Sequence, residues 1–183
     1  KLAEEDQGAV VTIPVTTGSD IVVGELNGQM VKNMESLQAV LEIRTDRATY
    51  TLPAVQIHID AVSEQLGQAV DLQDIKVQIE VAEPTADQVE IVNHAADEGL
   101  FALVVPPLEF TVKAIYGDTV IEVSRFNAYV ERMIAIPDGT DPNRITTGVI
   151  VDPDGTVRHV PTKVIQIDGQ YYAIINSLTN SMY

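Results

Sequence analysis

Oxygen-bearing side chains gather in one short loop, residues 138–143, where Asp138, Asp141 and Asn143 stand close together in the sequence. Calcium binds six to eight oxygen atoms, and the carboxylates, amides and backbone carbonyls of a single loop can supply many of them. Asp138, Asp141 and Asn143 are therefore candidate calcium ligands. The alternative is that the loop only turns the chain, since Asp141 followed by Pro142 is typical of the start of a helical turn.

Other patterns that could bind a ligand or carry out catalysis are weak. The loop 152–155 is also acidic, but neither loop ends in the Glu that a twelve-residue EF-hand requires. His58, His94 and His159 stand far apart in the chain, and we expect each at the surface or at a strand edge. Cysteine is absent, and no serine elbow, P-loop or dinucleotide-binding glycine motif occurs. The sequence predicts no catalytic residue, no cofactor-binding residue and no enzymatic activity.

Aromatic side chains, on which sugars commonly stack, are scarce at 5% of the chain, and tryptophan is absent. The local pairs are Tyr171 with Tyr172, and Phe126 with Tyr129. On a strand Tyr171 and Tyr172 would point to opposite faces, so they would not form one platform. A glycosidase needs two carboxylates across a cleft. The chain has 27 acidic residues, so the sequence does not exclude such a pair.

The charge balance argues against nucleic acids and anionic membranes as partners. The formal net charge is -16, and the 11 Lys and Arg residues never adjoin one another, so the clustered cations that nucleic acids and anionic membranes require are missing. The longest apolar run, residues 100–108, contains two prolines and is far shorter than the ~20 residues of a membrane span. No signal peptide is visible, and a start at Lys1 is typical of an excised or processed fragment.

Strand patterns dominate the sequence. Residues 75–81 place four aliphatic side chains on one face and polar ones on the other, the pattern of a half-buried strand. Similar apolar, β-branched or alternating segments separated by Gly, Asp and Pro turns predict further strands at 9–15, 21–26, 40–44, 48–52, 101–105, 108–116, 119–123, 128–136, 147–151, 156–160, 163–167 and 170–175.

Helical patterns are few. Residues 60–66 have Asp60 as an N-cap and Gly67 as a stop, and residues 85–97 have Thr85 as a cap and apolar residues every three or four positions. The alternative for the second segment is a strand over 88–92. The prediction is a mainly β protein leaning towards α+β, an antiparallel sandwich-like fold with one or two short helices.

The helix and the prolines near the middle suggest a division of the chain. It would give a β-rich subdomain over 1–84, a connection over 85–107 and a second β-rich subdomain over 108–183, unless the whole chain is one domain. Residues 41–60 and 149–168 match in their apolar and turn positions at a constant offset, as a duplicated unit would. The alternative is that any hairpin followed by a proline produces this match.

Five stretches of the chain resemble one family of modules. They cover residues 20–33 (DIVVGELNGQMVKN), 49–53 (TYTLP), 126–137 (FNAYVERMIAIP), 145–161 (ITTGVIVDPDGTVRHVP) and 169–180 (GQYYAIINSLTN). They resemble the module immediately upstream of S-layer homology domains in cell-surface proteins of Gram-positive bacilli and clostridia. In that family, the segment similar to 174–183 continues directly into the S-layer homology repeats.

The resemblance implies an extracellular protein of the cell wall or S-layer. In the family, anchoring belongs to the repeats, which bind a secondary cell-wall polymer. We therefore expect a non-catalytic spacer that positions functional domains relative to this anchor. The expected partners are adjacent domains of the same chain, including downstream repeats, with the S-layer lattice or a wall polymer as further candidates. The alternatives are a polysaccharide-binding module and an accessory module of a cell-surface polysaccharide hydrolase.

Overall fold

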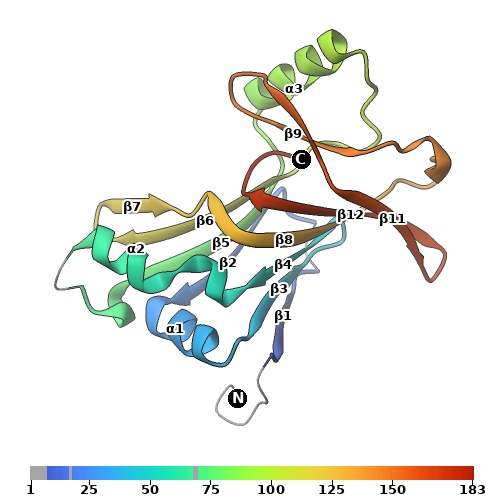
Figure 1. Cartoon of the computed structure of the whole chain (residues 1–183). Helices are drawn as coiled ribbons and strands as arrows, with labels where there is room; N and C mark the ends of the chain where they lie inside the picture. The colour runs from blue at the N-terminus through green and yellow to red at the C-terminus, as the bar shows by residue number, and fades with distance from the viewer. Residues whose placement is uncertain (1–7, 17, 68–69) are drawn as a thin grey trace.

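The computed structural model describes residues 8–16, 18–67 and 70–183, of which 45% are in strands and 24% in helices. Two β-sheets pack face to face, and short helices cover parts of this sandwich (Figure 1). The prediction of a mainly β, sandwich-like α+β fold is confirmed. No helix of the described residues is long and apolar enough to cross a bilayer.

The first sheet has six strands, in the order β1 (Val10–Pro14), β3 (Val40–Arg44), β4 (Ala48–Pro53), β8 (Arg125–Ala135), β12 (Gln170–Thr179) and β11 (Thr162–Ile167). β1 pairs with β3 in parallel, and the other neighbours are antiparallel. The second sheet has the order β2 (Ile21–Asn27), β5 (Lys76–Ala82), β6 (Glu109–Tyr116) and β7 (Thr119–Glu122).

A separate hairpin, β9 (Gly148–Val151) and β10 (Val157–Val160), is joined to the second sheet by the last residues of the chain. Met182 forms bridges to both Glu109 and Val151, and Tyr183 exchanges two backbone hydrogen bonds of 2.9 Å with Leu108. The segment 181–183 thus lies between β6 and β9 (Figure 1).

Both sheets combine strands from 1–84 with strands from 108–183, through the pairs β4–β8 and β5–β6. The boundary predicted near 85–107 therefore does not separate two sheets. One buried cluster fills the space between the sheets, and in it Tyr50 of β4 meets Phe110 of β6 with ring centroids 5.2 Å apart. The alternation predicted for β5 holds, since Val77, Ile79 and Val81 are buried there.

The two predicted helices form close to their expected bounds. α2 (Ile59–Leu66) begins one residue before Asp60, so Asp60 lies in the first turn and does not cap it. α3 (Ala86–Gly99) has the predicted cap, because Thr85 and Gln88 form a reciprocal capping box. The strand alternative over 88–92 is wrong. Short 3-10 turns are η2 (Ala54–Ile57), η3 (Leu72–Asp74) and η4 (Pro142–Arg144).

A third helix, α1 (Gly28–Ser36), was not predicted. The side chain of Asn27 caps it by accepting a 2.8 Å hydrogen bond from the amide of Met30. It packs close to the end of the second sheet, where a Cβ on Gly28 would lie 2.7 Å from the carbonyl oxygen of Leu72. Val31 and Met34, one helical turn apart, are buried in the main core.

The strand predicted over 101–105 is wrong. Leu100 has the left-handed backbone conformation that ends α3, and the amide of Phe101 turns back to the carbonyl of Ala96. Pro106 and Pro107 have no amide hydrogen to donate to a sheet. The position beside the start of β6 is taken instead by residues 181–183.

The predicted match between 41–60 and 149–168 extends only to a pair of hairpins. In the first hairpin Leu41 pairs with Leu52, but in the second Val149 pairs with His159, which shifts the register by one residue relative to the constant offset. The following segments also differ, because 54–57 is a 3-10 turn and 162–167 is a strand. The simpler interpretation, two unrelated hairpins, fits these pairings.

Candidate functional site

The predicted calcium loop forms a capped turn. The carboxylate oxygen Oδ1 of Asp141 accepts hydrogen bonds of 3.0 Å from both the backbone and the side-chain amide of Asn143, so this oxygen is engaged at the start of η4. Asp138 lines a surface hollow whose lining includes neither Asp141 nor Asn143. Within the described ranges, no group of three or more acidic, His or Cys side chains is placed to hold a metal. Calcium binding by Asp138, Asp141 and Asn143 stays a prediction.

The other residues considered for chemistry are dispersed. Asp152 forms a two-pronged ion pair with Arg158 across the β9–β10 hairpin, with distances of 2.8 and 2.9 Å. His58 lies in the turn before α2, His94 is exposed on α3, and His159 on β10 faces an apolar cavity described below. The three imidazoles thus belong to three separate elements.

Four of the chain's tyrosines lie on three strands, β6, β8 and β12. Tyr116 at the end of β6 and Tyr129 on β8 are exposed, while Tyr171 and Tyr172 are half-buried on β12. None of these four makes a ring–ring contact with another aromatic residue in the described part of the chain. The aromatic contacts found there lie in the interior.

The centre of the interior holds a charged side chain. Arg132 of β8 is fully buried, and its guanidinium carbon lies 4.6 to 5.4 Å from the ring centroids of Tyr183, Tyr50 and Phe110. A cation at such distances is attracted to the negative face of an aromatic ring. We refer to Arg132, these three rings and Asn180 as the Arg132 cluster.

Hydrogen bonds complete the Arg132 cluster. Nη1 of Arg132 donates to the carbonyl of Val130, and Nη2 donates to the carbonyl of Thr179 and to Oδ1 of Asn180, each at 2.8 Å. No carboxylate partner of Arg132 is present among the described residues, and its Nε has no hydrogen-bond acceptor there. The charge is thus held by carbonyl dipoles and ring faces rather than by a counter-ion.

Asn180 links this charge to its surroundings. Its Oδ1 also accepts a 2.6 Å hydrogen bond from the hydroxyl of Tyr50, and its Nδ2 donates to the carbonyl of Val123 at 3.0 Å. Burial raises the pKa of the Tyr50 hydroxyl, despite the opposing effect of the nearby Arg132 charge. The hydroxyl of Tyr183 donates to the carbonyl of Thr179 at 2.5 Å. The Arg132 cluster therefore attaches the segment 179–183 to both sheets.

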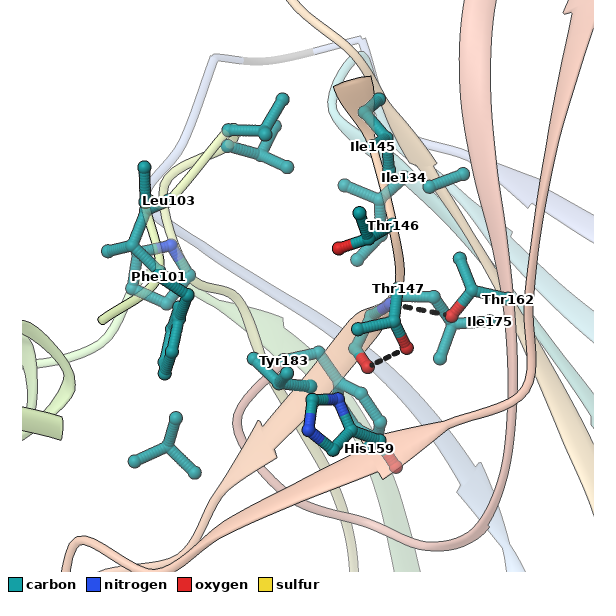
Figure 2. A pocket seen from close by; sticks show the side chains of 18 of the residues that line it. Phe101, Leu103, Ile134, Ile145, Thr146, Thr147, His159, Thr162, Ile175 and Tyr183 are labelled. Carbon is teal, nitrogen blue, oxygen red and sulfur yellow. Dashed lines mark hydrogen bonds between the residues drawn. The ribbon is translucent and has the colours of Figure 1, made fainter. Parts of the chain in front are cut away.

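An apolar cavity of about 170 Å³ lies beside this segment. Figure 2 shows Phe101 and Leu103 on one wall, and Ile134, Thr146, Thr147 and Ile175 on the opposite wall. His159 and Tyr183 lie at one end of the gap between these walls (Figure 2). A wider hollow of about 550 Å³ adjoins the cavity and shares Val105, Ile134 and Ile136 with it.

The second wall is fixed by a close approach of the backbone. The amide of Gly148 donates to Oγ1 of Thr162 at 2.7 Å, and Thr162 donates in turn to the carbonyl of Val160 at 2.8 Å. A Cβ on Gly148 would lie 2.8 Å from that hydroxyl oxygen and 2.9 Å from the Ile175 side chain. Only glycine allows this spacing, so the wall is preset by packing.

Both features had signals in the sequence that our predictions did not use. Arg132 stands between Val130 and Ile134 on the inward face of an alternating segment, where a charge is unexpected. One cavity wall is formed by residues 101–105 and 107, which belong to the longest apolar run of the chain, 100–108. Comparisons with protein-family models, curated proteins and solved structures find no match for this chain.

Proposed function

We propose that this chain is a non-catalytic structural module of an extracellular, S-layer-associated cell-surface protein, where it holds neighbouring domains at a fixed spacing from a wall anchor. The proposal builds on the resemblance of residues 20–33, 126–137 and 145–161 to modules that precede S-layer homology domains. The observation that carries it is the Arg132 cluster, which attaches the segment 179–183 to the centre of the sandwich.

A spacer transmits load through its two ends, so each end must be held by more than one contact. β1 is paired with β3 at five register positions, from Val10↔Val40 to Pro14↔Arg44. At the other end, the segment 181–183 is paired with residues 108–110, and the guanidinium of Arg132 donates to the carbonyl of Thr179 and lies over the ring of Tyr183. Tension between the ends therefore crosses both sheets and the core between them (Figure 1).

Single-molecule force spectroscopy tests this property directly. The chain is placed between two marker domains and extended through its ends. If the sandwich resists as one unit, it opens in a single step whose length corresponds to the whole folded region, roughly 600 Å at ~3.6 Å per residue. Early release of the C-terminal segment at low force, followed by a shorter main step, would contradict a load-bearing role.

Two substitutions make the test specific. Arg132→Met removes the anchor of the segment 179–183, and we expect it to lower the opening force or to add an early short step. Arg125→Met is the matched control, because Arg125 is an exposed arginine on the same strand. An unchanged force trace for Arg132→Met would remove the main structural support for the spacer function.

Binding to cell walls separates the spacer from the polysaccharide-binding alternative. The chain carries a net charge of -16, so anionic wall polymers should repel it unless a dedicated cationic pocket forms. We expect residues 1–183 to stay in solution with purified wall fragments, and a chain extended through S-layer homology repeats to sediment with them. Saturable sedimentation of 1–183 with and without calcium would favour the polysaccharide-binding module. Sedimentation only with calcium would direct mutagenesis to Asp138, Asp141 and Asn143.

A further inference from the structure

The loop 100–108, part of which walls the apolar cavity, exposes several apolar side chains. Leu100 is 93% exposed, and Leu103 and Val104 are more than a third exposed, in the same run as Phe101 and Val105. The amides of residues 102–105 make no backbone hydrogen bond among the described residues. This wall is therefore apolar and not paired with a strand, and it faces an unfilled space.

The size of the cavity limits what it can hold. At about 170 Å³ it is comparable to engineered apolar cavities that remain dry and bind a benzene ring. The opposite wall cannot move inwards easily, because Gly148, Thr162 and Ile175 are already in close contact. The cavity therefore fits one compact apolar group, such as a phenyl ring or a branched aliphatic chain.

The charged residues in the cavity lining indicate which polar group a ligand would carry. Arg144 and His159 both line the cavity, and they are the residues in its lining that can carry a positive charge. Arg144 is exposed and forms no ion pair within the described residues, although acidic side chains outnumber basic ones in this chain. No Asp or Glu is among the lining residues. An anionic group of a bound ligand would therefore meet cationic side chains and no competing carboxylate in the lining.

We propose that this cavity binds a ligand that joins one compact apolar group to a carboxylate, with the apolar group between Leu103 and Ile175 and the carboxylate towards Arg144. This inference goes beyond the spacer function and does not depend on it. A free aromatic acid and the C-terminal residue of an apolar peptide share this chemistry.

Titration with 3-phenylpropionate, followed by amide chemical shifts of the full chain, tests the proposal. We expect saturable shifts concentrated in residues 101–105 and 145–149, with a Kd of about 1 mM, the scale for so small a ligand. The uncharged analogue 3-phenylpropanol should bind about tenfold more weakly. The absence of saturable shifts at these residues, or equal binding of the acid and the alcohol, would overturn the proposal.

Paired variants identify the two parts of the site. Ala173 lines the cavity and is nearly buried, so Ala173→Leu should fill the space and abolish binding, whereas Ala61→Leu on the exposed face of α2 should not change it. Leu103→Asn tests the same wall from a half-exposed loop and does not disturb the core; it should weaken binding at least fivefold. Retained affinity in both Ala173→Leu and Leu103→Asn would overturn the cavity as the site.

The carboxylate part is tested by Arg144→Gln, which should remove the preference for the acid over the alcohol. Arg125→Gln, an equal change of net charge at an exposed arginine outside the cavity lining, should leave that preference unchanged. If both variants show the same preference for the acid, Arg144 does not bind the carboxylate and the proposal is wrong. An N-acetylated tripeptide ending in Phe, compared with its C-terminal amide, then distinguishes the sources: tighter binding than 3-phenylpropionate identifies a peptide end, and weaker binding identifies a free acid.

Discussion

The Arg132 cluster and the apolar cavity adjoin each other, and Tyr183 belongs to both, yet they are opposite in construction. Around Arg132 the interior is closely filled, and a buried charge is held by three hydrogen bonds and three aromatic rings. In the cavity, the lining is mainly aliphatic, and the space between its walls is unfilled. The Arg132 cluster is filled by its own side chains, with Nε of Arg132 as its one unsatisfied polar atom among the described residues, whereas the cavity leaves room for a group from outside.

This difference shows how a β-sandwich can combine rigidity with an open site. The two terminal nitrogens of Arg132 are satisfied by directional hydrogen bonds, and losing them would leave more than the Nε of this buried charge without a partner, so the Arg132 cluster tolerates little displacement of Thr179, Asn180 or Tyr183. Apolar walls have no such directional requirement, and a space between them costs mainly lost packing. Substitutions in the two regions should therefore have very different effects on stability.

Among substitutions in the two regions, the largest effect is expected for Arg132→Met. The substitution removes three hydrogen bonds. Two effects offset part of this loss: the oxygens of Thr179 and Asn180 still accept hydrogen bonds from the hydroxyls of Tyr183 and Tyr50, and the cost of burying a charge disappears. The balance is a loss of about 2–4 kcal/mol in the free energy of unfolding. Urea denaturation measures it, with the exposed Arg125→Met as the control, which should change stability by less than ~0.5 kcal/mol.

A loss below 1 kcal/mol for Arg132→Met would mean that the buried charge and its hydrogen bonds nearly cancel. The comparison between the two regions would then fail, because the Arg132 cluster would contribute little to the stability of the sandwich.

A smaller effect is expected for Tyr50→Phe, which removes one hydroxyl and leaves the ring in place. At neutral pH the loss of its hydrogen bond to Asn180 should cost about 1–1.5 kcal/mol. Burial raises the pKa of this hydroxyl above its ordinary value of 10.0. Above pH 10 the unfolded chain releases the Tyr50 proton while the folded chain retains it, so folded stability falls as pH rises.

The measurement is urea denaturation between pH 8 and pH 11. The wild-type chain should lose up to ~1.4 kcal/mol per pH unit above pH 10 from Tyr50, and Tyr50→Phe should lack this contribution. The difference in the free energy of unfolding between the wild-type chain and Tyr50→Phe should therefore become smaller as pH rises. A constant difference would show that the Tyr50 hydroxyl is not protected from ionisation in the folded chain.

Most of the fold followed from local patterns in the sequence. Alternation in segments such as 75–81 reflects one buried face, and Thr85 with Gln88 forms the capping box typical of a helix start. The failures came from long-range effects. α1 is short and depends on packing against residues 72–75. The segment 101–105 is not a strand, because residues 181–183 pair with the start of β6 instead. Local patterns carry no information about such competition.

The two sites could be predicted only in part. The inward position of Arg132 was legible, but its partners Tyr50 and Asn180 are separated from it by long stretches of chain and meet it only through strand order. The apolar run 100–108 was visible, but whether it packs or stands open depends on the opposite wall at 145–149. The loop 138–143 was predicted as either a calcium loop or a turn, and Asp141 caps a turn there.

On the cavity side, Leu100→Gly should stabilise the chain by about 0.5–1 kcal/mol. Leu100 ends α3 with φ +53°, a left-handed conformation that glycine adopts without strain, and its side chain is almost fully exposed. The gain is reduced because glycine has more freedom in the unfolded chain. Thermal and urea denaturation measure it, and Leu100→Asn should give a smaller gain. Destabilisation by Leu100→Gly would show that the Leu100 side chain packs against the protein.

The smallest effect is expected for Leu103→Ala. Leu103 is half-exposed and faces the unfilled cavity, so removing its side chain deletes few contacts, and the free energy of unfolding should fall by no more than ~0.5 kcal/mol. Leu52→Ala is the matched control, because Leu52 is fully buried between the sheets and the same truncation should cost about 2–5 kcal/mol. Urea denaturation of both variants measures the two losses in the free energy of unfolding. If Leu103→Ala cost as much as Leu52→Ala, the loop 100–108 would be packed down in solution, the cavity would be closed, and the contrast with the Arg132 cluster would disappear.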